Sequence, residues 1–397
     1  MSTPTPVVPP PPTATAPGRI LVVDDTEANR DLLARRLRAL GHEVVLAESG
    51  REALERVAAE PFDLVLLDIM MPEMDGYAVL ERLAADPEGS RVPVVMISAV
   101  DESASVARCI ELGAADYLPK PFNPIVLKAR VTATLERKRL EDRERLHARS
   151  LERELEIGRE IQRDFLPDEL PRPDGWEIAS LFQPARLVGG DFYDAFPTAD
   201  GALALVIADV CDKGVGAALY MALFRSLIRS HAELHCAAAT AIPAARSVVA
   251  LTNDYIARTH GRSNMFATVF FALLDPATGE FAWVNGGHEP PIVRRRTGAL
   301  ERLAPSGPAV GLFPEASFLA RGGALEPGDT LLAFTDGVTE ERDASGALYG
   351  EARLAALVEA SDASPAALLE EIERDVRAHR GETDPSDDVT LLALRRR

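Results

Sequence analysis

Polar side chains end most of the apolar runs in the first third of this chain. Asp24 and Asp25 end the first run, Asp68 ends the third, Ser98 ends the fourth and Lys120 follows the fifth. If these runs are parallel strands, their carboxyl ends meet at one edge of a sheet. Carboxylates crowded there repel one another unless a cation neutralises them, and a hard ion such as Mg²⁺ suits oxygen ligands. The set predicts phosphoryl transfer, in which one carboxylate attacks phosphorus while the lysine and the serine hold phosphoryl oxygens.

Two further acids lie on a predicted hairpin in the second half of the chain. Asp191 precedes a short run, residues 197–201 have the composition of a turn, and Asp209 lies near the end of the next apolar run. With the turn centred near Ala199, Asp191 would lie opposite Ile207 and diagonal to Asp209 on the same face. The hairpin therefore predicts that two carboxylates can share an ion.

Acids also stand at the ends of two later apolar runs. Asp336 follows the run that ends at Thr335, and Asp387 and Asp388 precede the last run of the chain. Carboxylates without paired Cys or His suit Mg²⁺ or Mn²⁺, and two such ions about 3.5 to 4 Å apart can generate hydroxide and neutralise a phosphate. This second set predicts metal-assisted phosphoester hydrolysis.

The apolar runs of the first set alternate with helical patterns from Arg19 onward. Such alternation predicts a doubly wound α/β domain with a five-stranded parallel sheet and five helices. The predicted strands are Ile20–Val23, Val44–Ala47, Leu64–Leu67, Val94–Ile97 and Asp116–Leu118.

Residues 125–165 contain no proline, are rich in Glu and Arg, and place apolar residues at mostly helical intervals. The pattern predicts one long helix, which is the final helix of the first domain and a linker. Two interpretations remain open for it, a single solvated helix with one apolar face or a dimeric coiled coil that makes the protein a homodimer.

Residues 166–397 are expected to form a second, α+β domain. Strand patterns predominate there, and helical stretches such as Gly216–Ala232 separate them. The predicted strands are Ala202–Val210, Ala267–Leu274, Phe281–Asn285, Thr330–Thr335 and Val389–Leu394.

Composition narrows the class of protein. The formal net charge of -19 repels a phosphate backbone and an anionic lipid surface, so nucleic acid is not expected as a direct partner. The three cysteines are widely spaced, which favours a reducing cytoplasm, and no apolar run approaches the roughly 18 residues of a membrane span. Residues 1–18, rich in Pro and Thr, are expected to be a disordered tail.

Four segments of the first domain, VVDD, LLDIMMPEMDG, ISA and KPF, resemble the response regulator receiver domain in order and spacing. By this resemblance, residues 19–124 are a receiver domain core that a sensor histidine kinase phosphorylates. The resemblance also implies a cis peptide before Pro121. The implied roles are Asp68 as phosphoacceptor, Asp24, Asp25, Asp68 and the Met70 carbonyl at Mg²⁺, Ser98 and Lys120 at the phosphoryl group, and Tyr117 as aromatic switch.

The segments GGDFYDAF, ADVCDKGVGAALYMA, NGGHEPP, FTDGVTE and SDDVT resemble the stage II sporulation protein E type of PPM phosphatases. The resemblance runs from about Ile157 to Leu394 and implies a β-sandwich flanked by helices. It also implies two Mn²⁺ or Mg²⁺ ions, a water nucleophile and a phosphorylated anti-sigma-factor antagonist as substrate. The implied ligands are Asp191, Asp209, Asp336 and Asp387, with the Val210 carbonyl assisting; Asp387 is preferred to Asp388 because the family's ligand comes first in that motif.

Other polar residues near these motifs receive weaker interpretations. Lys213 and Arg186 lie close to the motifs, but no pattern ties them to a substrate phosphate. His231 and His235 are spaced like a zinc pair but lack the rest of such a motif, so a surface pair is favoured. His288 is either a proton shuttle or, as we favour, a histidine that holds its turn by hydrogen bonds.

The two domains together predict a response regulator whose phosphorylation on Asp68 controls a metal-dependent protein serine/threonine phosphatase in a partner-switching pathway. An alternative is a receiver-controlled adaptor that binds such a partner without catalysis, although binding alone would not need four acids. A DNA-binding regulator is disfavoured by the charge and by the lack of a basic recognition helix.

Overall fold

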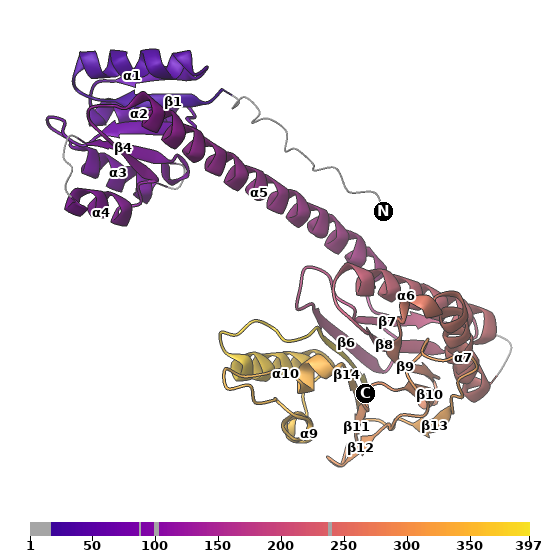
Figure 1. Ribbon diagram of the computed structural model, residues 1–397. Coiled ribbons are helices and arrows are strands. Elements are labelled where there is room, and N and C mark those ends of the chain that lie inside the picture. The colour runs from indigo at the N-terminus through magenta and orange to yellow at the C-terminus, as the bar shows by residue number, and fades with distance from the viewer. Residues whose placement is uncertain (1–16, 87–88, 99–102, 237–239) are drawn as a thin grey trace, which may run out of the picture. The chain divides into compact units, whose positions relative to one another are not determined.

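The computed structural model describes residues 17–86, 89–98, 103–236 and 240–397 (Figure 1). Nearly all of the predicted tail, residues 1–18, lies outside these ranges. The chain divides into two compact units, Met1–Ser150 and Leu151–Arg397, and each is described by itself.

The first unit contains a five-stranded parallel sheet in the order β2-β1-β3-β4-β5, as the alternation of runs predicted. The strands are β1 Arg19–Val23, β2 Glu43–Ala47, β3 Leu64–Asp68, β4 Val94–Ser98 and β5 Asp116–Pro119. The helices are α1 Glu27–Ala39, α2 Gly50–Ala59, α3 Gly76–Ala85, α4 Ser103–Glu111 and α5 Pro124–Phe165, with a short 3₁₀ helix at Gly89–Arg91.

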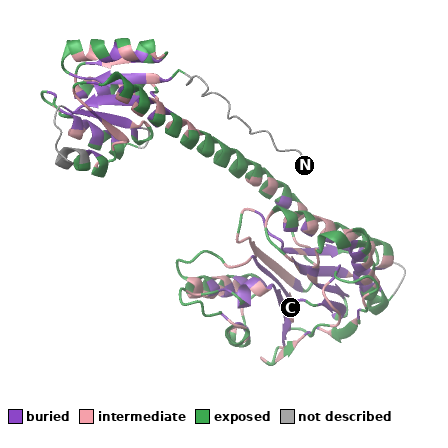
Figure 2. Cartoon of the chain, viewed as in Figure 1, coloured by how far each residue is buried: buried purple, intermediate pink, exposed green. Residues whose placement is uncertain are grey.

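Helices cover both faces of this sheet, which explains why its strands are continuous apolar runs. On one face Leu33 and Leu37 of α1 join Leu127 and Val131 of α5 in one buried cluster. On the other face, a second cluster contains residues of α2, α3 and α4, and Figure 2 shows the strands buried between them. Apolar packing on both faces therefore fixes the sheet and, with it, the edge at which the carboxyl ends of its strands lie.

Helix α5 is continuous over the predicted range and crosses the boundary between the two units. Its first turns are buried against the sheet, whereas several apolar side chains farther along are exposed. These are Leu140, Leu146, Leu151, Ile157 and Ile161. The exposed stripe is compatible with both interpretations of this helix, and the coiled coil stays a prediction.

The second unit contains two antiparallel five-stranded sheets. The first has the order β13-β10-β9-β8-β7, and the second the order β12-β11-β14-β15-β6. The strands are β6 Trp176–Gln183, β7 Phe192–Pro197, β8 Leu203–Val210, β9 Ala267–Leu274, β10 Glu280–Gly286, β11 Ile292–Arg294, β12 Leu300–Arg302, β13 Arg321–Ala324, β14 Thr330–Phe334 and β15 Val389–Arg396. The helices are α6 Val215–Cys236, α7 Ala241–Thr259, α8 Asp336–Thr339, α9 Glu351–Ala360 and α10 Pro365–Arg380, with a 3₁₀ turn at Gly261–Ser263.

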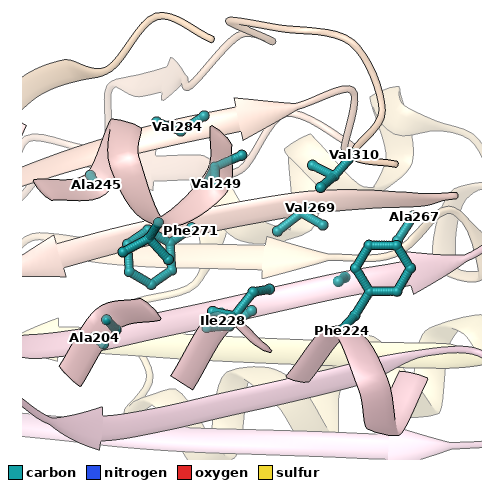
Figure 3. Close-up of a cluster of buried hydrophobic side chains, with 14 of the residues drawn as sticks. Ala204, Phe224, Ile228, Ala245, Val249, Ala267, Val269, Phe271, Val284 and Val310 are labelled. Carbon is teal, nitrogen blue, oxygen red and sulfur yellow. The ribbon is translucent and has the colours of Figure 1, made fainter. Parts of the chain in front are cut away.

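Three apolar layers hold this unit together, and they confirm the expected β-sandwich flanked by helices. One layer, which includes Ile207 and Leu392, lies between the two sheets. Another joins the first sheet to α6 and α7, and Figure 3 shows Phe224 and Ile228 of α6 within it. The third packs α9 and α10 on the second sheet.

The predicted register of the β7–β8 hairpin was wrong by two residues. The pairing joins Phe192 to Ala208, so the next position along would set Asp191 level with Asp209 and not with Ile207. The cause is the turn, which closes between Thr198 and Ala202 and so lies one residue later than predicted. With the register corrected, the two acids are expected to lie closer together than the sequence predicted.

Among the described residues, no helix has both the length and the apolar character that crossing a membrane requires.

Asp194 ties β7 to α6 from a fully buried position. Its carboxylate lies 2.7 Å from Arg229 Nε and 2.9 Å from Arg225 Nε. Removing the negative charge of Asp194 would leave the two arginine charges without their buried partner. Asp194→Asn should therefore lower the free energy of unfolding by about 3 kcal/mol. Urea unfolding measures this, with the exposed Asp174→Asn as control, and equal stabilities of the two variants would contradict it.

Candidate functional site

The receiver-like unit brings its predicted acids together at the carboxyl edge of the sheet. Asp24 and Asp25 follow β1 and Asp68 ends β3, and ligand oxygens of all three lie within 4.8 Å of one another. Burial raises the pKa of Asp68, which shows the cost of holding charge there. Three carboxylates at this spacing fit a divalent cation, and this donor set matches the predicted Mg²⁺.

Lys120 is the amine of this edge. Its Nζ lies 2.9 Å from an oxygen of Asp24 and 2.9 Å from an oxygen of Asp68. Burial alone would lower the pKa of Lys120, but its hydrogen bonds to the two carboxylates outweigh this and raise it. The peptide between Lys120 and Pro121 is cis, as the resemblance implied. Lys120 therefore stays protonated within reach of the predicted phosphoacceptor.

The remaining receiver residues are placed as follows. Ser98 ends β4 and is buried, and its carbonyl accepts a hydrogen bond from the Lys120 amide at 2.7 Å. Tyr117 lies on β5 with its ring 4.9 Å from the guanidinium carbon of Arg130. The Met70 side chain is 70% exposed, and the role implied for its carbonyl stays a prediction.

In the second unit, Asp191 is buried where the two sheets meet. Its Oδ2 accepts hydrogen bonds from Thr335 Oγ1 at 2.7 Å and from Thr390 Oγ1 at 2.6 Å. Thr335 directly follows β14 and Thr390 lies on β15, whereas Asp191 directly precedes β7 of the first sheet. Residues of the second sheet therefore orient an acid at the end of the first. With both bonds on Oδ2, the other oxygen of Asp191 is left for a further ligand.

Asp209, Asp336 and Asp387 converge on the same place, since each affects the ionisation of another. Burial, followed by the charge of Asp336, raises the pKa of Asp209 to about 7. Burial and the charge of Asp387 raise the pKa of Asp336, and burial and Asp209 raise that of Asp191. Acids that lie close enough to raise the pKa of their neighbours fit a site built for cations.

The four acids are spread more widely than the receiver's three. In the ranges that the structure covers, only Asp24, Asp25 and Asp68 have ligand atoms that all lie within 4.8 Å of one another. A wider spread suits two neighbouring ions, as predicted, rather than one ion held by all four acids. Val210, whose carbonyl was predicted to assist, ends β8 next to Asp209.

Asp387 and Asp388 differ in what they bind. Asp388 is buried, and its two oxygens accept backbone hydrogen bonds from Ala185 at 2.8 Å and from Gly190 at 2.7 Å. Asp387 is half-buried and lies 2.8 Å from Lys213 Nζ. Backbone amides therefore occupy both oxygens of Asp388. Asp387 Oδ1 accepts from the Asp388 amide at 2.9 Å, but its Oδ2 is paired with the Lys213 side chain, which an ion can displace, and this favours Asp387 as the ligand.

Several residues that support the site carried no motif signal of their own. Thr335 and Thr390 orient Asp191. Glu341, fully buried, accepts hydrogen bonds from Ser386 N at 3.2 Å and Ser386 Oγ at 3.0 Å, and so fixes the loop that carries Asp387. Thr335 and Thr390 lie within FTDGVTE and SDDVT, and Glu341 directly follows FTDGVTE, so only these positions beside the acids could have suggested them.

The histidines do not extend the metal set. His288 is buried, its Nδ1 lies 2.8 Å from Thr268 Oγ1, and burial lowers its pKa to about 3, so it stays neutral in its turn. His231 Nδ1 lies 3.0 Å from Thr252 Oγ1. In the described ranges, His231 and His235 belong to no group of three metal-ligating side chains. A structural role for these histidines is favoured.

Comparisons with known proteins match both units. The family model described as stage II sporulation protein E matches residues 199–397, and the response regulator receiver domain model matches residues 20–132. Protein IcfG of Synechocystis sp. is 40% identical over 262 residues, which are 61% of this chain and 41% of IcfG. Response regulator PleD of Caulobacter vibrioides is 46% identical over 113 residues, 28% of this chain and 25% of PleD.

The fold of the second unit is also found among solved structures. The SiaA-PP2C domain of Pseudomonas aeruginosa has a TM-score of 0.54 and 21% sequence identity, and the match covers 63% of this chain and 98% of that domain. At this identity the likeness shows a PP2C-type fold. The chain spans less than half the length of the curated relatives it matches.

The raised pKa of Asp209 predicts that Mn²⁺ binding at this cluster would depend on pH. Because the pKa is about 7 in the fold against 3.8 ordinarily, Asp209 takes up a proton as the pH falls through 7. Mn²⁺ would have to displace this proton, so its affinity should fall about fivefold from pH 7 to pH 6 for one proton released. In the ion-free protein, the same group lowers stability as the pH rises through 7.

Isothermal titration of Mn²⁺ at pH 6, 7 and 8 measures this dependence. Asp209→Asn, which has no proton to displace at that position, should show a flatter profile. An affinity that is the same for the wild type at pH 6 and pH 8 would contradict the assignment.

Proposed function

Because this chain belongs to the stage II sporulation protein E family and carries a response regulator receiver domain ahead of the family's domain, we propose that it is a two-component response regulator that controls a metal-dependent protein serine/threonine phosphatase. One observation carries the phosphatase assignment: Asp191, Asp209 and Asp336 are buried together, where burial and neighbouring acids raise the pKa of each, and Asp387 lies close enough to Asp336 to affect it. An adaptor without catalysis would gain nothing from this unfavourable cluster.

In the receiver unit, a sensor histidine kinase would phosphorylate Asp68. Asp24, Asp25 and Asp68 would hold Mg²⁺ together with the Met70 carbonyl. Lys120 reaches an Asp68 oxygen at 2.9 Å and would turn to an oxygen of the phosphoryl group. Ser98 would contact another of these oxygens, and Tyr117 would respond as the switch.

In the second unit, the four acids would hold two Mn²⁺ or Mg²⁺ ions. Bound ions of this kind supply a nucleophilic water and neutralise phosphate charge. The chain itself fixes the ligands, because Thr335 and Thr390 orient Asp191 and the backbone bonds of Asp388 hold the loop before it. Lys213 lies beside Asp387 at the mouth of this cluster.

The substrate we propose is a phosphorylated anti-sigma-factor antagonist, so that the protein acts in a cytoplasmic partner-switching pathway. The resemblance to the family supports this substrate. The net charge of -19 disfavours direct contact with DNA, so an effect on transcription would pass through the antagonist.

We also propose that α5 joins two copies of the chain as a coiled coil. Its exposed apolar side chains, among them Leu140, Leu151 and Ile161, support this because burial against a second helix would remove them from water. The helix also connects the phosphoacceptor's unit to the metal-site unit through one continuous backbone.

Asp336→Asn tests the enzyme assignment directly. Loss of a metal-ligating carboxylate should lower the rate on a phosphorylated antagonist protein with Mn²⁺ by more than about a hundredfold, since even residues that only support ligands cost tenfold to a hundredfold. Release of inorganic phosphate gives the rate, and Asp174→Asn serves as the exposed control. Equal, metal-independent rates for both variants would favour the adaptor.

Regulation is tested by changing the state of Asp68. Beryllofluoride added to the wild type should change the phosphatase rate or the oligomeric state, because it mimics the phosphoryl group on the carboxylate. Asp68→Asn should abolish this response. Rate assays and light scattering measure the two effects, and unchanged values in both would remove the proposed coupling.

A further inference from the structure

Lys213 lies at the mouth of the acidic cluster in the second unit. Its Nζ is 2.8 Å from an oxygen of Asp387, and it donates to the Ser386 carbonyl at 2.7 Å. The side chains of Lys213 and Asp387 are 36% and 37% exposed, whereas Asp191 is buried. Lys213 and Asp387 therefore form the side of the cluster that a substrate in solution would reach first.

The backbone around Lys213 fixes the point from which its side chain extends. The residues on either side, Asp212 and Gly214, both have a left-handed backbone, with φ of 72° and 85°, so the chain turns sharply between β8 and α6. The Asp212 carboxylate accepts a hydrogen bond from the Lys213 amide at 2.8 Å. The other end of the side chain is held by the Ser386 carbonyl, in a loop that Glu341 fixes.

The charge of Lys213 acts on the cluster itself. Burial and the charge of Asp387 raise the pKa of Asp336, and the charge of Lys213 opposes this rise. An ion bound by Asp387 would take over the neutralising effect that the ammonium has there, since both are cations beside the same carboxylate. Because like charges repel, the ion and the ammonium would compete for Asp387.

A displaced Lys213 ammonium would stay at the mouth of the cluster. It has three donors, and its bond to the Ser386 carbonyl does not depend on Asp387. The stem of a lysine is flexible, and its ammonium binds phosphate oxygens as a point charge. A chain with a formal net charge of -19 repels a phosphate, so a cation at this entrance would favour the approach of the substrate.

We propose that Lys213 is a further catalytic residue of the second unit: its ammonium neutralises Asp387 in the ion-free protein and, once an ion has taken over Asp387, binds an oxygen of the substrate's phosphate. This inference rests on the proposed function for the reaction. Lys213 makes and breaks no covalent bond, so its contribution is charge and position alone. Removal of the ammonium should therefore have two opposite effects, tighter ion binding and weaker phosphate binding.

The first measurement is isothermal titration of Mn²⁺ into the full chain. All proteins carry Asp25→Asn, which weakens the receiver site so that the heat reports the second unit. Lys213→Met removes the competing ammonium and should tighten Mn²⁺ binding by about threefold, as is typical for the loss of a largely solvated ion pair. Lys128→Met, an exposed change of the same kind in the first unit, should leave the affinity unaltered.

The second measurement is the affinity of the same proteins for inorganic phosphate, by isothermal titration in saturating Mg²⁺. Lys213→Met should weaken phosphate binding by about tenfold, because a hydrogen bond between charged groups is lost. With a phosphorylated antagonist protein as substrate, KM should rise by a larger factor than kcat falls. Lys213→Arg keeps the positive charge and should restore phosphate binding to within about threefold of the Lys128→Met protein.

Equal phosphate affinities of the Lys213→Met and Lys128→Met proteins would overturn the proposal. Unchanged or weaker Mn²⁺ binding in Lys213→Met would also overturn it, because an ammonium that competes with the ion cannot help to bind it. Neither titration depends on turnover. If both affinities change as expected but the wild type releases no phosphate from a phosphoprotein, Lys213 stands as counterion and phosphate ligand, and the phosphatase assignment falls.

Discussion

Repulsion between neighbouring carboxylates is the constraint that the rest of this protein depends on. In an unfolded chain in water such groups would move apart, so holding them together in the fold costs free energy. The receiver edge lowers this cost with one ammonium, that of Lys120, which bridges Asp24 and Asp68. The second cluster has Lys213 only at its rim, beside Asp387. Burial and neighbouring acids accordingly raise the pKa of Asp191, Asp209 and Asp336.

The two sheets of the second unit supply the opposing stabilisation. The apolar layer between them, which includes Leu205 and Phe270, favours close approach of the sheets along their whole length. Asp209 extends from the first sheet and Asp336 follows a strand of the second, so the force that closes the sandwich also brings the acids together. The Thr335 and Thr390 hydroxyls then orient Asp191 across the junction.

Sequence patterns predicted those features that depend on local order along the chain. Acids at the ends of apolar runs, such as Asp68 and Asp336, could be identified because strand ends of a sheet share an edge. The β7–β8 register could not, because it depends on where the turn closes, and the turn lies one residue later than its composition suggested. Strands β6 and β11 to β13 were also missed, since they lack a long apolar run.

Support residues were hardest to find because their partners are distant in sequence. Thr390 is 199 positions from Asp191 in sequence, and Thr335 is 144 positions from it. A hydroxyl side chain has no type-specific reason to be buried at these positions. Only the folded arrangement shows that such a residue completes a hydrogen-bonding set.

Strand β15 has a place in the sheet that differs from its place in the chain. Among the described elements it comes last in sequence, yet it lies between β14 and β6, and β6 pairs with no other described strand. During synthesis on the ribosome, β6 emerges roughly two hundred residues before β15. It therefore stays without its strand partner while that part of the chain is made. The second sheet can close, and the pair of hydroxyls that orients Asp191 can be completed, only after β15 has emerged.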